Sequence, residues 1–306
     1  MERPIYTLPP DLFVGGPYAL APSNLWHYPR EQWEAVWKRV TGKGLRGAIL
    51  DTGYKAHPDL PVPIYTKSFI SGQSIVDGNG HGTHCSGTML GRNGLGGAPE
   101  ADLISIKVLS NQGSGGSDGI EAGIRDAADA GADVISMSLG GGGSDAGTNS
   151  AIDYAWSKGC YVIAAAGNSG YNGSNTIGWP GRYENCICTA SYKEDGEISN
   201  FSSGGPQITW ALPGSNIVSC SLTEAYTLMS GTSMACPGGA AVLLLIKELQ
   251  LREGLPIWRS ASEAKNFIKL NTQDAGAPGF DPRFGLGKPL INTIIEGLIN
   301  DTLVWS

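Results

Sequence analysis

Apolar segments that alternate with helix-like segments constrain the fold of this chain more than any other feature. The four strongest apolar segments are residues 45–51, 103–109, 133–139 and 161–166. Helical patterns start between them, near His81, near Ser117 and near Ala146. Strands that are apolar along almost their whole length are typical of a parallel sheet with both faces covered. We therefore predict an α/β domain of three layers, with a mainly parallel central sheet and helices on both faces.

The rest of the sequence fits a single domain with a short arm in front of it. Shorter strands are expected over residues 186–191, 207–211, 216–219 and 226–229. Long helical patterns cover residues 232–250 and 260–270. Residues 1–24 are rich in proline and lack periodicity, and helical spacing first appears at Trp33. The predicted division is an extended arm over residues 1–24 and a domain over residues 25–306.

Charge and hydropathy exclude two classes of partner. The net charge is −7, whereas a nucleic-acid-binding protein normally presents a basic face, so nucleic acid is not expected as a partner. No run of about 18 apolar residues occurs, so no segment is expected to span or enter a membrane. The N-terminus lacks the apolar core of a signal peptide. We expect a cytoplasmic protein if Met1 is the natural start, and a secreted one if this is a mature domain with an added methionine.

The six cysteines have no spacing that predicts a zinc site. Cys186 and Cys188 are separated by one residue, so they would point to opposite faces of a strand. This pattern favours free buried thiols. One or two disulfides remain an alternative, because connectivity cannot be read from a sequence.

Three glycine-flanked blocks supply an aspartate, a histidine and a serine in that order. Asp51 ends the first strong strand, His81 follows a glycine-rich turn, and Ser233 looks exposed at the start of the longest helix. Each residue alone has a structural explanation, as a turn aspartate, a structural histidine or a helix cap. Together they match a catalytic triad, in which an acid orients an imidazole that takes the hydroxyl proton. His84, one helical turn after His81, is the structural histidine in this interpretation.

Asn168 is the candidate donor for an oxyanion. It follows the strand that ends near Ala166, and its side-chain amide could reach the carbonyl oxygen of a substrate. A turn asparagine after Gly167 is the structural alternative.

These motifs resemble those of the subtilisin-type serine proteases. The residues that carry the resemblance are 48–53, 57–60, 79–84, 138–141, 165–168 and 231–235, followed by Pro237. The similarity covers residues 25 to 270. It implies an endopeptidase that acts on polypeptides, with Asp51, His81 and Ser233 as the triad. Asn168 and the Ser233 N–H would form the oxyanion hole.

The same resemblance implies a substrate-binding groove. The block Ser138, Leu139 and Gly140 would pair with the substrate backbone as an added strand. The residues assigned to the groove beside these three are Ala166, Gly167 and Gly178. Gly178 would leave the first specificity pocket open to a large apolar or aromatic P1 side chain, although an ordinary turn glycine is the alternative.

Three departures from the family pattern stand out. Gly238 and Gly239 replace a His-Val pair that most relatives have, so the packing of the nucleophile helix is expected to differ while activity survives. The loop over residues 91–97 is shorter than the one that holds a tight calcium ion in many relatives, and Thr209 stands where a carboxylate often completes a second cation site. We expect no cofactor for the chemistry, and structural calcium stays open without support at these two positions.

The arm resembles the N-terminal extension of the intracellular branch of the family. Residues 4–10 could lie across the active site, and proline at a scissile bond makes a poor substrate because it lacks an N–H and fixes φ. We predict that the arm inhibits in cis, against the alternative of an unstructured terminus.

Three other functions compete with a serine endopeptidase as the interpretation of this sequence. An α/β-hydrolase esterase requires Gly-x-Ser-x-Gly and the order Ser, acid, His, which this chain lacks. A catalytically silent subtilisin fold that binds peptides is a second alternative. A narrower activity, exopeptidase or peptide maturation, is the third.

Overall fold

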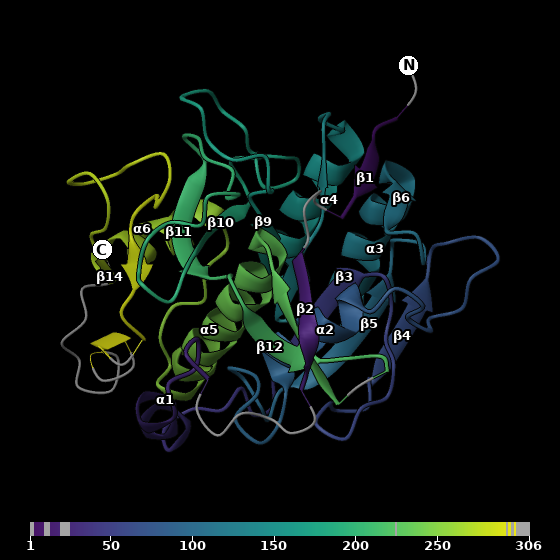
Figure 1. Ribbon diagram of the computed structural model, residues 1–306, viewed down its shortest axis with the longest axis horizontal. Helices are drawn as coiled ribbons and strands as arrows, with labels where there is room; N and C mark the ends of the chain where they lie inside the picture. The colour runs from purple at the N-terminus through teal and green to yellow at the C-terminus, as the bar shows by residue number, and fades with distance from the viewer. Residues whose placement is uncertain are drawn as a thin grey trace.

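A seven-stranded parallel sheet forms the centre of the computed structural model (Figure 1), which describes residues 3–8, 13–18, 25–223, 225–291, 293–294 and 297. The strand order is β11-β10-β9-β7-β3-β5-β4, and every neighbouring pair is parallel. The strands are β3 (Arg46–Asp51), β4 (Tyr65–Ser68), β5 (Asp102–Lys107), β7 (Val134–Met137), β9 (Tyr161–Ala165), β10 (Ile187–Tyr192) and β11 (Ile208–Pro213). The predicted α/β class and parallel sheet are confirmed.

Helices cover both faces of this sheet. On one face α2 (His81–Leu90) packs against α5 (Thr232–Arg252), and on the other α3 (Ser117–Asp129) packs against α4 (Ala146–Ser157) (Figure 1). Two more helices, α1 (Arg30–Trp37) and α6 (Ala261–Leu270), complete the outer layers. The predicted helix starts at His81, Ser117 and Ala146 are confirmed to the residue.

The helix α5 is the central core element. In the described part of the chain it is the one helix long and apolar enough to cross a membrane, but 89% of its apolar window is buried inside the protein. It touches five strands of the sheet, β3, β7, β9, β10 and β11. Its apolar character is therefore explained by burial against the sheet.

The described parts of the arm pair with distant strands. The strand β1 (Ile5–Thr7) lies antiparallel between β6 (Ser114–Gly116) and β8 (Gly140–Gly141). Further along the arm, β2 (Phe13–Tyr18) pairs with β13 (Tyr226–Ser230), which pairs in turn with β12 (Ile217–Cys220). A short ribbon, β14 (Thr272–Gln273) with β15 (Lys288–Pro289), follows α6. The alternative of an unstructured terminus does not hold for these arm residues.

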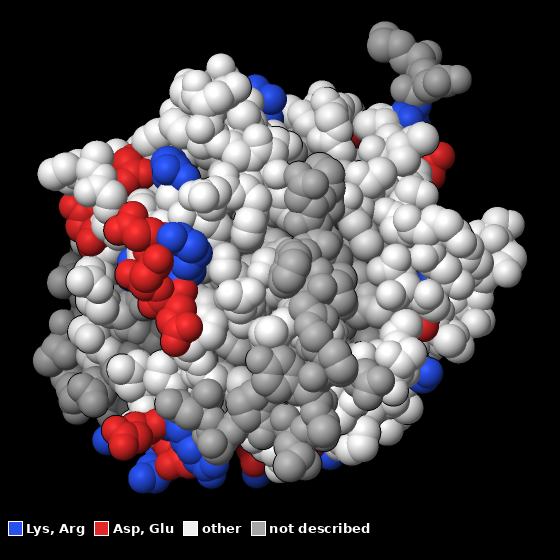
Figure 2. Space-filling view, viewed as in Figure 1, with Lys and Arg blue, Asp and Glu red and all other residues white. Residues whose placement is uncertain are grey.

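The charged side chains are mixed in sign. Figure 2 shows acidic and basic groups side by side at the left and lower edges of this face. The coloured residues of this face form no continuous basic area of the kind that binds nucleic acid.

Candidate active site

Asp51 and His81 form a buried pair at the carboxyl end of the sheet. Asp51 is the last residue of β3, His81 is the first of α2, and neither side chain is exposed. His81 Nδ1 lies 2.8 Å from Asp51 Oδ1 and 2.9 Å from Oδ2. Gly82 permits this approach of helix to strand, because a Cβ there would lie 2.5 Å from the Gly53 carbonyl oxygen. Ligand sites in open α/β sheets lie at this edge.

Asp77 holds the start of α2 in place, a role that the sequence reasoning missed. Its Oδ1 accepts hydrogen bonds from the Gly80 N–H at 2.8 Å and from the Thr52 hydroxyl at 2.9 Å. Its Oδ2 accepts from both the N–H and the hydroxyl of Thr83. An aspartate three residues before a glycine, at the entry to a helix, was the signal that could have found it.

The environment of His81 pulls its pKa in two directions. Burial alone lowers the pKa because it disfavours the imidazolium. Asp51 and, to a smaller extent, Cys85 raise the pKa and together outweigh burial, so the pKa of His81 ends well above its usual value of 6.5. The pair therefore favours the imidazolium form that follows proton uptake.

Ser233 is fully buried, which corrects the expectation of an exposed serine. It lies in the first turn of α5, beneath the end of β7, where its hydroxyl donates to the Ser138 carbonyl oxygen at 3.3 Å. His81 Nε2 has no hydrogen-bond partner among the described residues. Cys85 bridges the two helices, with Sγ 3.8 Å from His81 Nδ1 and 3.5 Å from the Ser233 carbonyl oxygen. The Ser233 hydroxyl therefore bonds to Ser138 and not to His81. Hydrogen bonds between catalytic groups commonly tighten only when substrate binds.

The amide of Asn168 is oriented by the start of α5. Its Oδ1 accepts hydrogen bonds from the N–H and the hydroxyl of Thr232, both at 3.0 Å. Because Oδ1 is committed to Thr232, Nδ2 lies on the opposite side of the amide group. Gly167, with φ of 105°, makes the turn that brings Asn168 there. A side-chain donor is thus fixed next to Ser233.

The predicted substrate-binding glycines line one cavity of about 270 Å³. Its wall includes Gly140, Gly167 and Gly178, together with Asn168 and the arm residue Thr7. The Gly178 N–H donates to the Ala166 carbonyl oxygen at 2.9 Å, which places Ala166 behind this wall.

The strand β1 pairs with Gly140 and Gly141, so Gly140 is the residue of the predicted strand-pairing block that lies in this ladder. The side chain of Leu139 is fully buried in the core, and the Ser138 carbonyl oxygen accepts from the Ser233 hydroxyl. Pairing of the block with a substrate backbone stays a prediction.

The structure also shows the environments of His84 and of the six cysteines. His84 is a structural residue: its Nε2 lies 3.0 Å from the Ile217 carbonyl oxygen, and burial lowers its pKa to about 3. All six cysteines are free and buried. Within the described ranges, the one group of side chains close enough to share a metal ion is Asp51, His81 and Cys85, which contains the buried Asp51–His81 pair. The expectation about calcium stays a prediction.

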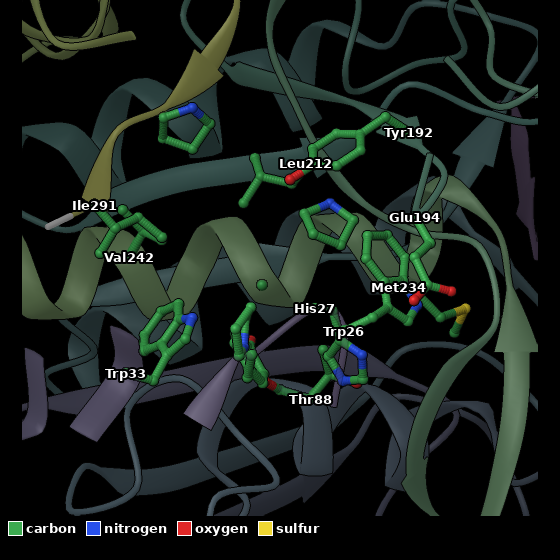
Figure 3. A pocket seen from close by; sticks show the side chains of 15 residues that line it. Trp26, His27, Trp33, Thr88, Tyr192, Glu194, Leu212, Met234, Val242 and Ile291 are labelled. Atoms are coloured by element: carbon green, nitrogen blue, oxygen red, sulfur yellow. The ribbon is translucent and has the colours of Figure 1, made fainter. Parts of the chain in front are cut away.

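A second cavity, of about 230 Å³, lies against α5 (Figure 3). Trp26, Trp33 and Tyr192 surround it, and Met234 of α5 faces it. Gly238, the first of the two adjacent glycines in this helix, also lines it. The departure from the family pattern at Gly238 thus lies beside a cavity along α5.

The fold and the site define a hydrolase of the serine-protease class. A model of the Subtilase family, peptidase S8, matches residues 42–287. This chain belongs to the subtilase family and is a serine endopeptidase.

Curated relatives support that membership. The chain is 40% identical to Subtilisin DY of Bacillus licheniformis over 268 residues, which are 83% of this chain and 93% of that protein. It is 41% identical to Thermitase of Thermoactinomyces vulgaris over 252 residues, 78% of this chain and 84% of that protein. Subtilisin Savinase of Lederbergia lenta is 35% identical over 263 residues, 84% of this chain and 94% of that protein.

Proposed function

We propose that Ser233 is the nucleophile of an acyl-enzyme reaction on polypeptides. Its Oγ bonds to the peptide carbonyl carbon while His81 Nε2 takes the hydroxyl proton. His81 then gives that proton to the leaving amine, and a water hydrolyses the acyl-enzyme by the same route. Asp51 holds the imidazole with its proton on Nδ1. The observation that carries this proposal is the buried Asp51–His81 pair at 2.8 Å, next to the helix that begins at Thr232.

Asn168 and the Ser233 N–H are proposed to bind the oxyanion. The Thr232 contacts orient the Asn168 amide before substrate arrives, so no reorganisation is needed as charge develops on the carbonyl oxygen. The first-turn N–H groups of α5 are unpaired within the helix, and its dipole favours negative charge at this end.

A fluorophosphonate probe tests the nucleophile. In a protein whose arm is loosened by Tyr6→Ala, at a fully buried position of β1, we expect one adduct in the intact mass, and none once Ser233→Ala is added, because only an activated serine reacts with the probe. Ser86→Ala removes another fully buried serine and should leave the adduct in place. An adduct that persists on Ser233→Ala contradicts the assignment.

The P1 preference is proposed to be large and apolar or aromatic. The cavity of about 270 Å³ that Gly178 lines supports this preference. A Cβ at Gly178 would stand 3.7 Å from Gly140 Cα, across the same wall, and so would narrow the cavity. Mapping of the bonds cleaved in an unfolded protein tests the preference.

The arm is proposed to inhibit in cis, as in the intracellular branch that the sequence resembles. The strand β1 pairs on both edges, with β6 and β8, in the way a substrate strand would. A Cβ at Gly141 would lie 2.9 Å from the Ile5 carbonyl oxygen, so the glycine permits this close approach. The Leu8 N–H donates to the Gly113 carbonyl oxygen at 2.9 Å. The arm thus uses hydrogen bonds that a substrate would need.

The sequence of the arm also favours inhibition over cleavage. Pro9 and Pro10 follow Leu8 in the sequence, and both lie outside the described residues. A Pro-Pro bond is a poor substrate, since proline lacks an N–H and fixes its own φ.

A further inference from the structure

Three carboxylates surround the guanidinium of Arg3, just before β1 enters the groove. Arg3 Nε donates to Asp145 Oδ2 at 3.0 Å, and Nη2 donates to Asp145 Oδ1 at 2.8 Å. Nη2 also donates to Glu121 Oε2 at 3.0 Å, and Nη1 pairs with Asp118. The contact with Asp145 is bidentate, the geometry that distinguishes a guanidinium from an ammonium group.

Asp145 is fixed by the domain independently of the arm. Its side chain is only 9% exposed, and its Oδ1 also accepts hydrogen bonds from the N–H and hydroxyl of Thr148 at the start of α4. The hydrogen bonds from Arg3 are the largest cause that lowers its pKa, to about 2, so Asp145 is ionised at neutral pH. The contacts with Thr148 therefore hold this carboxylate in place without the arm.

The space around the guanidinium is kept open by a glycine. A Cβ at Gly147 would overlap the Glu121 carboxylate and would lie 2.8 Å from Arg3 Nη2. Any larger residue at this position would displace one of the two charged groups. A buried carboxylate, two further carboxylates and this gap together form a binding site for a guanidinium.

Tyr6 fills a second site on the domain. It lies three residues after Arg3 and is fully buried, with its hydroxyl close to Thr148 and Tyr183. Between the two side chains, Ile5 is 65% exposed. Arg3 and Tyr6 are thus two side-chain anchors of the arm, and Asp145 links their sites, because the Tyr183 hydroxyl donates to its carbonyl oxygen at 2.7 Å.

We propose that Asp118, Glu121 and Asp145 form a cation subsite of the substrate groove. The subsite favours polypeptides with an arginine three residues before a tyrosine that fills the Tyr6 site. Arginine is favoured over lysine, because a single ammonium cannot make the bidentate contact with Asp145. This inference rests on the proposed function, in which β1 occupies the place of a substrate strand.

Peptide binding to the full chain tests the subsite without catalysis. The protein carries Ser233→Ala to prevent cleavage, with Arg3→Ala and Tyr6→Ala to loosen the arm. The probes are a fluorescent Arg-Pro-Ile-Tyr-Thr-Leu peptide and the same peptide with citrulline, a neutral isostere, in place of arginine. We expect the arginine peptide to bind about tenfold more tightly at low ionic strength, and the difference to shrink with added salt.

Matched variants identify the carboxylates. Adding Asp118→Asn and Glu121→Gln should reduce the preference to roughly threefold, since exposed ion pairs contribute modestly and Asp145 remains. Glu253→Gln removes a carboxylate that pairs with Arg252 elsewhere on the surface, and it should leave the preference unchanged. Asp145 itself is left intact because it caps α4.

The outcomes separate this subsite from the proposed function. Equal affinity for the arginine and citrulline peptides, or binding of neither, overturns the subsite. The loosened protein with Ser233 restored reports on the proposed function, through its fluorophosphonate adduct and its hydrolysis of an unfolded protein. Loss of both activities overturns the proposed function, whatever the peptides show.

Discussion

At the scale of single residues, the opposing effects on the pKa of His81 decide the pH range in which the enzyme is active. Burial lowers its pKa and Asp51 raises it, with a net rise well above 6.5. Only the neutral imidazole can take the proton of Ser233. Hydrolysis must therefore weaken as pH falls through the raised pKa of His81.

The variant Asp51→Asn tests this balance. Without the carboxylate, burial remains and lowers the pKa of His81, so the acid limb of kcat/KM should move from above pH 6.5 to below it. We expect kcat to fall by about 10²–10⁴-fold at the same time, because the imidazole loses its orientation. The measurement is the pH profile of kcat/KM on a peptide substrate.

The control for that profile is Asp133→Asn. Asp133 pairs with Lys247 at 2.7 Å, at the start of β7 and away from His81. The Asp133→Asn variant should leave the acid limb of kcat/KM at the same pH as in the wild type. An acid limb that stays above pH 6.5 in Asp51→Asn would mean that another group sets it.

At the scale of elements, much of the structure could be predicted from local patterns. The strand predictions around Asp51 and the helix starts at His81 and Ser117 rest on periodicity and glycine turns, which are local signals. The burial of Ser233 could not be predicted, because it depends on packing between α5 and the end of β7. The extended arm was predicted, but the pairing partners of β1 were not, because they are more than 100 residues away in the sequence.

The glycine pair in α5 gives a test at this scale. A Cβ at Gly238 would lie 3.6 Å from Tyr28 Oη, which is ordinary contact, so Gly238→Ala should raise the free energy of unfolding by about 1 kcal/mol through helix propensity. A Cβ at Gly239 would lie 2.7 Å from Ile163 Cδ1. Gly239→Ala should therefore lower the free energy of unfolding by roughly 1–3 kcal/mol through overpacking.

Urea unfolding in a Ser233→Ala background measures both effects without self-digestion. Each variant is the control for the other, because they are neighbours in the same helix. If both alanines stabilised the protein to the same extent, the packing assigned to Gly239 would be wrong.

At the scale of the whole molecule, the arm and the domain form one structure with the groove between them. The strand β1 is held through backbone pairing with β6 and β8, through the buried Tyr6, and through the carboxylates around Arg3. Further along the arm, β2 pairs with β13. A tethered segment competes at an effective concentration of millimolar order, so even modest contacts can exclude substrate.

The central claim is that this subtilase carries its own arm in the substrate groove, and hydrolysis of an unfolded protein by the Tyr6→Asp variant tests it most directly. A charge at this fully buried position should release β1 and raise the rate of hydrolysis at least about tenfold over wild type. Ile5→Asp, at a position 65% exposed in the same strand, is the matched control and should change the rate little. Adding Ser233→Ala to Tyr6→Asp should abolish hydrolysis. A rate for Tyr6→Asp equal to that of wild type would contradict the account.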